Sequence, residues 1–228
     1  MDYVLRILAG LLASIVVITL HEFAHAFVAY KCGDPTAKFS GRMTLNPIKH
    51  FDPLGMLMFA LVGFGWAKPV PINPYNFKNY KWGSFWTSAA GIIINYLTAF
   101  LFYPLFVLVC DYVCPLFTGK YAVDFFYLLA YYLFAYSLNF CVFNLLPFYP
   151  LDGFRIIDAL DTKKGKFYRF LRKYGYYIFL GLMLISIVAR RIPILGYLDI
   201  LGYVMSFATN ILGKPITLLW NFIFGLFI

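Results

Sequence analysis

Several apolar runs in this chain of 228 residues are long enough to cross a lipid bilayer. A helix needs about 20 residues to span ~30 Å of hydrocarbon. Hydrophobic residues make up 62% of the chain and charged residues only 13%, a composition typical of multispanning helical membrane proteins. The runs lie at about residues 4–30, 84–110, 122–146, 174–189 and 192–228. We therefore predict an all-α polytopic membrane protein with about five to six transmembrane helices.

Both ends of the chain are apolar. The first run is longer than the apolar region of a signal peptide, so we expect it to stay in the mature protein. The last run is interrupted by Gly213-Lys214-Pro215, where we expect one span to end and a half-helix or interfacial segment to begin. Because no internal repeat is visible, we predict one domain over 1–228, with a core at 4–155 and additional C-terminal membrane helices at 174–228.

The segment 53–66 is apolar but short. Its roughly 14 residues would extend only ~21 Å as a helix, and Gly55, Gly63 and Gly65 interrupt it. Such a segment suits an element that enters the membrane and returns on the same side, where irregular backbone is tolerated if protein surrounds it. We predict that 53–66 is re-entrant.

The net charge of +9 is unevenly distributed. If 53–66 is re-entrant, only two full spans separate the first basic loop from the last, and all basic loops share one side. The positive-inside rule then places these loops in the cytoplasm and the N-terminus outside. We interpret the charge as topology and lipid contact, with no nucleic-acid binding. Thirteen of the nineteen Lys and Arg residues lie in these loops: Lys31, Lys38, Arg42, Lys49, Lys68, Lys78, Lys81, Lys163, Lys164, Lys166, Arg169, Arg172 and Lys173.

Glu22 is the only glutamate in the chain, and it lies between His21 and His25 in a His-Glu-x-x-His pattern inside an apolar run. A carboxylate at the centre of a membrane helix costs roughly 2.5–3.5 kcal/mol. On a helix the two imidazoles lie one turn apart and can bind one zinc ion. The glutamate can then accept a proton from water that attacks a carbonyl group. The alternative is a histidine pair packed at a helix interface.

A catalytic zinc site needs a third protein ligand. A second glutamate is absent, and Val28 and Lys31 occupy the positions where the metzincin pattern requires glycine and histidine. His50 and the nine aspartates remain. His50 lies in a basic loop, where we expect it to lie at the surface or to gate access. Asp152 follows an apolar run and the proline-broken stretch 147–150, although an Asp-Gly turn or a helix N-cap would explain it equally well.

These residues resemble the site-2 protease family of intramembrane zinc metalloproteases, in particular its short prokaryotic members. The resemblance implies that Asp152 completes the zinc site with the two histidines, that Glu22 activates water, and that Asn144 helps to hold the substrate or the developing oxyanion. It also implies a multi-pass protein of a prokaryotic cell membrane. The matching stretches are residues 21–25 (HEFAH), 45–55 (LNPIKHFDPLG), 66–74 (WAKPVPINP), 91–95 (GIIIN) and 144–153 (NLLPFYPLDG).

The chain departs from the family pattern at two positions. Ile92 and Tyr149 replace prolines that are common among relatives, and we expect them to affect helix shape or substrate preference, since neither removes a ligand. No PDZ or CBS domain is present in this sequence. We therefore expect the membrane domain itself or a partner protein to control substrate access.

Prolines at 69, 71 and 74 preclude a regular helix there and favour extended backbone. Such backbone could bind an unfolded substrate by strand addition, or it could be a loop that merely follows the re-entrant segment. Cys110 and Cys114 flank the predicted outer loop 111–120, where they could form a disulfide or act as small packing residues.

The leading hypothesis is hydrolysis of a peptide bond within or next to the transmembrane segment of a membrane-protein substrate, with one Zn²⁺ per chain. A non-proteolytic zinc-binding scaffold or chaperone is the first alternative, but binding zinc alone does not require the general base Glu22. A multispan transporter is the second, and the absence of an inverted repeat argues against it.

Overall fold

The computed structural model describes residues 2–62 and 65–226. Within these residues the regular structure is helical, and the only β pairing is a single antiparallel bridge. Four helices are long and apolar enough to cross a membrane, namely α1, α4 with its continuation, α5 and α7. The all-α fold is therefore confirmed, with four candidate spans among the described residues, while a count of five to six spans stays a prediction. The helices are α1 (Asp2–Cys32), α2 (Thr36–Phe39), α3 (Pro53–Val62), α4 (Tyr80–Leu108), α5 (Lys120–Leu145), α6 (Asp152–Leu160), α7 (Lys166–Arg191) and α8 (Ile200–Gly225).

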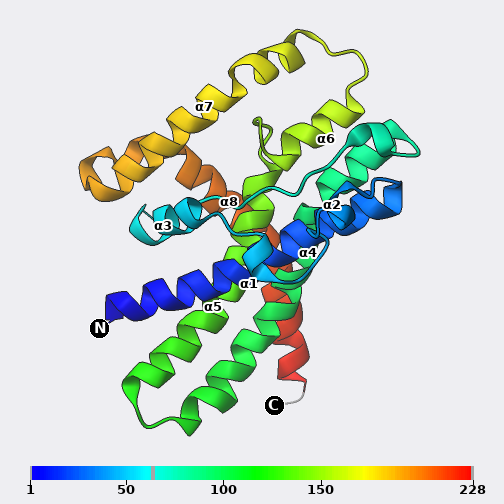
Figure 1. Ribbon diagram of the computed structural model, residues 1–228. Helices are drawn as coiled ribbons and strands as arrows, with labels where there is room; N and C mark the ends of the chain where they lie inside the picture. The colour runs from blue at the N-terminus through cyan, green and yellow to red at the C-terminus, as the bar shows by residue number, and fades with distance from the viewer. Residues whose placement is uncertain (1, 63–64, 227–228) are drawn as a thin grey trace.

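Helices α1, α4 and α5 pack against one another at the centre of the molecule (Figure 1). Their buried faces consist largely of small residues, which allow helix backbones to approach closely in a membrane. On α4 the buried set runs through Gly83, Thr87, Ser88, Ala89, Ala90 and Gly91. This tight packing brings the first and second long apolar runs into direct contact.

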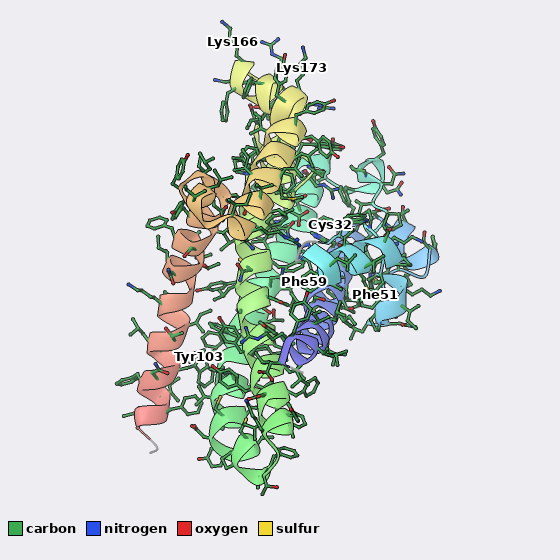
Figure 2. The ribbon with its side chains drawn as sticks, turned by 90° about the vertical axis from the view of Figure 1, so that its left-hand side faces the viewer. Cys32, Phe51, Phe59, Tyr103, Lys166 and Lys173 are labelled. Carbon is green, nitrogen blue, oxygen red and sulfur yellow. The ribbon has the colours of Figure 1, made fainter. Side chains whose placement is uncertain are left out.

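The C-terminal helices are attached to this bundle at two places. Phe154 of α6 packs with Tyr168 and Leu171 of α7, and Ile216 of α8 packs with Leu138 of α5. Lys166 and Lys173, in the first turns of α7, lie at one end of the molecule, far from the hairpin between α4 and α5 (Figure 2).

The expected break at residues 213–215 is wrong, because α8 continues through Pro215 as one helix. The buried Gly213 lies against Leu138 of α5, and Ile216 is only 1% exposed. Packing against α5 on both sides of the proline thus outweighs the hydrogen bond that the proline removes.

The segment predicted to be re-entrant begins with the short helix α3. The bridge between Phe51 and Ala67 places the two ends of the segment side by side. Gly55 and Gly65 lie so close that a Cβ atom on Gly65 would overlap the Gly55 carbonyl. Residues 63–64 lie outside the described part of the chain. Adjacent ends are what a returning segment requires, and its insertion into the bilayer stays a prediction.

The predicted loop at 111–120 is shorter than expected. Helical structure continues after α4 through residues 109–116, so that only residues 117–119 connect it to α5. Cys110 and Cys114 lie in this continuation, and both have free thiols.

Candidate metal centre

The histidine pair belongs to one buried stripe along α1. Residues four positions apart lie one above another on the same face of a helix. In α1 this face is buried against the bundle at Ala9, Ala13, Val17, His21, His25 and Ala29. The same periodicity that buries the alanines therefore points both imidazoles into the interior.

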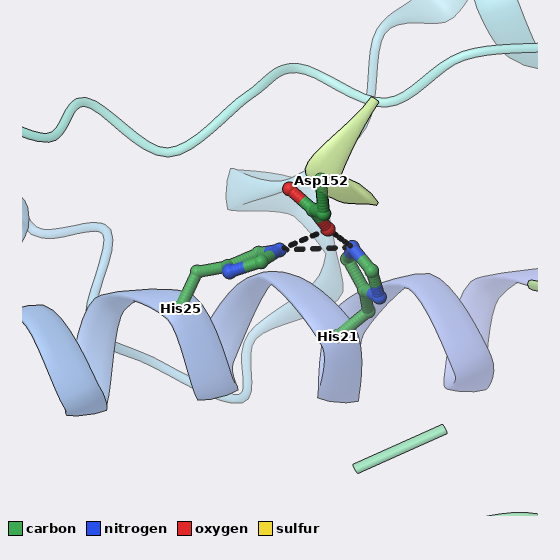
Figure 3. Close-up of side chains that lie close together, drawn as sticks. All are labelled: His21, His25 and Asp152. Atoms are coloured by element: carbon green, nitrogen blue, oxygen red, sulfur yellow. Dashed lines mark hydrogen bonds and ion pairs between the residues drawn. The ribbon is translucent and has the colours of Figure 1, made fainter. Parts of the chain in front are cut away.

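Asp152, the first residue of α6, meets the two imidazoles there (Figure 3). Its Oδ2 lies 3.3 Å from Nε2 of His21 and 3.0 Å from Nε2 of His25, and the two Nε2 atoms are 3.0 Å apart. Ligands bound at 2.0–2.2 Å in a tetrahedral site lie about 3.3 Å from one another. The three atoms thus form a triangle of the size that a zinc ion requires.

The donor set also fits zinc chemically. Two neutral imidazoles and one carboxylate are typical zinc ligands. Asp152 is 5% exposed, and its Oδ2 has no hydrogen-bond donor in the described residues. A buried carboxylate oxygen without a donor is costly, and coordination of a cation would satisfy it. The positive metal charge would offset the cost of burying the carboxylate.

Helix α4 orients both histidines through the nitrogens that face away from Asp152. Nδ1 of His25 lies 2.7 Å from the Thr87 carbonyl, to which it can only donate. The side-chain amide of Asn95 lies 3.0 Å from Nδ1 of His21. The Asn95 oxygen is buried without a partner, and turning the amide so that this oxygen accepts from Nδ1–H satisfies both groups. Both Nε2 atoms then carry a free lone pair for a metal.

Gly91 allows α4 to approach this closely. A Cβ atom at this position would overlap the rings of both histidines. Gly91 and Asn95 are one turn apart on α4, so a single helix face makes room for the ligands and orients one of them. The stretch 91–95 resembles the family pattern, but the sequence alone gives neither residue a role; their four-residue spacing is the local signal for one.

Glu22 lies next to the ligands and contacts the segment that follows α3. Its Oε2 accepts a hydrogen bond of 2.9 Å from the Val70 backbone N–H. We call residues 65–73 the strap; within it no regular helix forms, as the prolines predicted. The contact holds the carboxylate of Glu22 beside the strap, close to the three candidate ligands.

The strap is held in place by Asp34 and Arg42, neither of which the sequence singled out for this role. The buried Asp34 carboxylate accepts hydrogen bonds from the Asn73 backbone at 2.7 Å and from the Asn76 amide at 2.8 Å. Arg42 donates to the carbonyls of Lys68 and Pro69. Burial opposes ionisation of Asp34, but hydrogen bonds from Thr36, Asn76 and Asn73 lower the pKa of this carboxyl group.

The structure places His50 and Asn144 away from the ligand triangle. His50 is fully buried, which corrects the expectation of a surface position. Its Nε2 lies 2.8 Å from the Thr44 carbonyl, and its own carbonyl accepts from the Lys68 N–H, so it is enclosed between its own loop and the strap. The Asn144 side chain donates to the Phe140 carbonyl within α5, and its role toward substrate stays a prediction.

Comparison with known proteins identifies the family of this chain. Residues 111–186 match Peptidase family M50, a range that includes Asp152 but not the histidine pair. Over 184 residues, 79% of this chain and 82% of the relative, the chain is 40% identical to "Putative zinc metalloprotease YwhC" of Bacillus subtilis. A stretch of 64 residues, 26% of this chain and 24% of the relative, is 42% identical to "Putative zinc metalloprotease Rip2" of Mycolicibacterium smegmatis. No solved structure matches. The chain belongs to peptidase family M50, the site-2 protease family.

Proposed function

We propose that this chain is a zinc endopeptidase that hydrolyses a peptide bond within or next to the transmembrane segment of another membrane protein. The observation that carries the proposal is the convergence of His21, His25 and Asp152 into one buried triangle, with Glu22 on the same helix as the histidines. When bound there, zinc supplies a Lewis acid that polarises the substrate carbonyl and makes water more acidic.

Different residues at the site have different roles in catalysis. His21, His25 and Asp152 hold the metal, and Thr87 and Asn95 fix the histidine tautomers. Glu22 removes a proton from the attacking water and delivers it to the leaving amine. Buried helices around the ligands limit access of bulk water, so charge that develops on the substrate oxygen is weakly screened.

The strap provides a binding site for extended substrate. Its Asn73 backbone and its Lys68 and Pro69 carbonyls are already bonded to Asp34 and Arg42. The Ile72 N–H has no partner among residues 2–62 and 65–226. A substrate unwound from its helix can pair with such free backbone by strand addition. This pairing would bring its peptide bonds close to Glu22.

We further propose the orientation that the sequence predicts, with the three basic loops in the cytoplasm. Single cysteines near Lys38, Lys78 and Lys166, introduced into a cysteine-free background, should be shielded from an impermeant thiol reagent in intact cells, whereas one near Thr118 should react. If the cysteines near Lys38 and Lys78 react from opposite sides of the membrane, the re-entrant assignment is contradicted. Control of substrate access by a partner protein is part of the same proposal.

Replacing Glu22 by glutamine tests catalysis separately from metal binding. Glutamine keeps the shape of the side chain but cannot accept a proton, so hydrolysis of a panel of single-span substrates should fall by about 10²–10⁴-fold with normal zinc content. A zinc chelator should abolish the activity of the unmodified protein. Turnover that is unchanged in Glu22→Gln would refute the proposed mechanism, and intact zinc binding without any hydrolysis by the unmodified protein would favour a scaffold.

A further inference from the structure

A second site lies away from the metal centre. An open cavity of about 580 Å³ is lined by the start of α1, the end of α3, the second half of α5, the end of α7 and the start of α8. None of the candidate zinc ligands lines it. The beginning of α1, α3 and the end of α7 lie on the same side of the molecule in Figure 1.

The cavity collects positive charge. Nineteen Lys and Arg residues are present, and thirteen lie in the three basic loops. Of the remaining six, Arg6, Arg190 and Arg191 line this one cavity. Arginine within a membrane span is costly and typically faces a partner or a polar cavity. Three of them around one cavity indicate an anionic ligand.

Acidic residues of the chain neutralise only one of these three arginines in the described residues. Nε of Arg190 lies 3.7 Å from Oδ2 of Asp199. Asp2 is one turn before Arg6, yet no ion pair joins them, and none involves Arg191 in the part of the chain that the structure describes. Two guanidinium groups therefore remain available at the cavity.

Much of the remaining wall of the cavity is apolar, although Asn139 and Ser186 also line it. Ile7, Phe140, Met183 and Met205 contribute to the apolar part, and methionine side chains adapt readily to a flexible ligand. A ligand that complements both the arginines and the apolar wall has an anionic group attached to a hydrocarbon chain. Arg6 and Arg191 lie near helix ends, and guanidinium binds phosphate through two parallel hydrogen bonds.

We propose that this cavity binds one anionic phospholipid, with the phosphate between Arg6 and Arg191 and an acyl chain along the apolar part of the wall. The site does not depend on catalysis. Phosphatidylglycerol is the probe, and zwitterionic phosphatidylcholine is its neutral counterpart.

Native mass spectrometry of the full chain in detergent tests this site. The unmodified protein should retain phosphatidylglycerol about 10- to 30-fold better than phosphatidylcholine, because each basic residue near an anionic lipid contributes roughly fivefold in affinity. The double variant Arg6→Gln/Arg191→Gln should lose this preference. The matched control is Lys166→Gln/Lys173→Gln at the opposite end of α7 (Figure 2), which should keep it. Phosphatidylglycerol should also raise the melting temperature of the unmodified protein and of the control, but not of the arginine variant.

Three results would overturn the proposal. Equal retention of the two lipids would show that the arginines do not select charge. Displacement of phosphatidylglycerol by inorganic phosphate at equal concentration would indicate an anion site without a lipid component. Displacement by a single-span peptide with an aspartate near one end would assign the cavity to protein substrates.

Discussion

The metal centre and the strap lie side by side but are held in opposite ways. His21 and His25 are fixed by hydrogen bonds that they donate to α4, and Gly91 packs directly against their rings. The strap is attached to Asp34 and Arg42, whereas Ile72 keeps a free N–H among the described residues. The difference suggests that the chemistry requires fixed ligands, and that substrate binding requires backbone that can still form hydrogen bonds.

Gly91→Ala should have the largest effect, because it disturbs the rigidly held metal centre. The added methyl group overlaps both imidazoles, and displacement of ligands by about 1 Å can cost about 100-fold in rate. We expect activity to fall at least that far, with reduced zinc content by metal analysis. Gly181→Ala in α7, where a Cβ atom meets nothing within 4 Å, is the control. Normal zinc in Gly91→Ala would mean that the rings are more mobile than described.

Two substitutions of Asn95 test the metal centre in a graded way. Asn95→Ala removes the acceptor for Nδ1–H of His21, and loss of such a partner lowers metal affinity by about 10- to 100-fold. Asn95→Asp keeps an oxygen at this position and should retain more zinc in a competition titration with a chelator. The control is Asn139→Ala, whose amide bonds only to its own helix at Ala135. Equal affinity in the alanine and aspartate variants would contradict the orienting role.

Asp34→Asn should act on the strap alone. It removes an acceptor from the Asn73 N–H, and a hydrogen bond to a charged group contributes about 1.5–3 kcal/mol. We expect KM to rise about tenfold with unchanged zinc, since 1.4 kcal/mol corresponds to a factor of ten. Asp161→Asn is the control, because Asp161 accepts similar turn hydrogen bonds from Lys163 and Lys164. Loss of zinc in Asp34→Asn would show that strap and metal centre are not separable.

The same aspartate predicts a pH dependence of stability. Because hydrogen bonds lower the pKa of Asp34, its stabilisation is present above the pKa of the unfolded chain, about 3.9, and disappears as the pH falls through the lower folded value. The melting temperature of the unmodified protein should therefore fall more steeply below about pH 4 than that of Asp34→Asn. Parallel curves would show that Asp34 is not stabilised in the ionised form.

The sequence predicts the features of this protein that depend on local periodicity. A helical repeat suffices to place His21 and His25 together, but the approach of Asp152 depends on how α6 returns from the end of α5. There Gly153 lies against the carbonyls of Leu145 and Leu146, a contact that no local pattern encodes. His50 was expected at the surface because its neighbours are charged, and pairing of its loop with the strap buries it instead. Local propensity also failed at Pro215, where packing against α5 preserves the helix.

Zinc content after loss of each possible third ligand tests the account most directly. Asp152→Ala should lose both zinc and activity, because two histidines alone leave the site incomplete. His50→Ala should keep about one zinc per chain and lose at most part of the rate, since its side chain contacts the Thr44 carbonyl and not the ligand triangle. The opposite result, in which zinc is lost only on removal of His50, would contradict the metal centre described here.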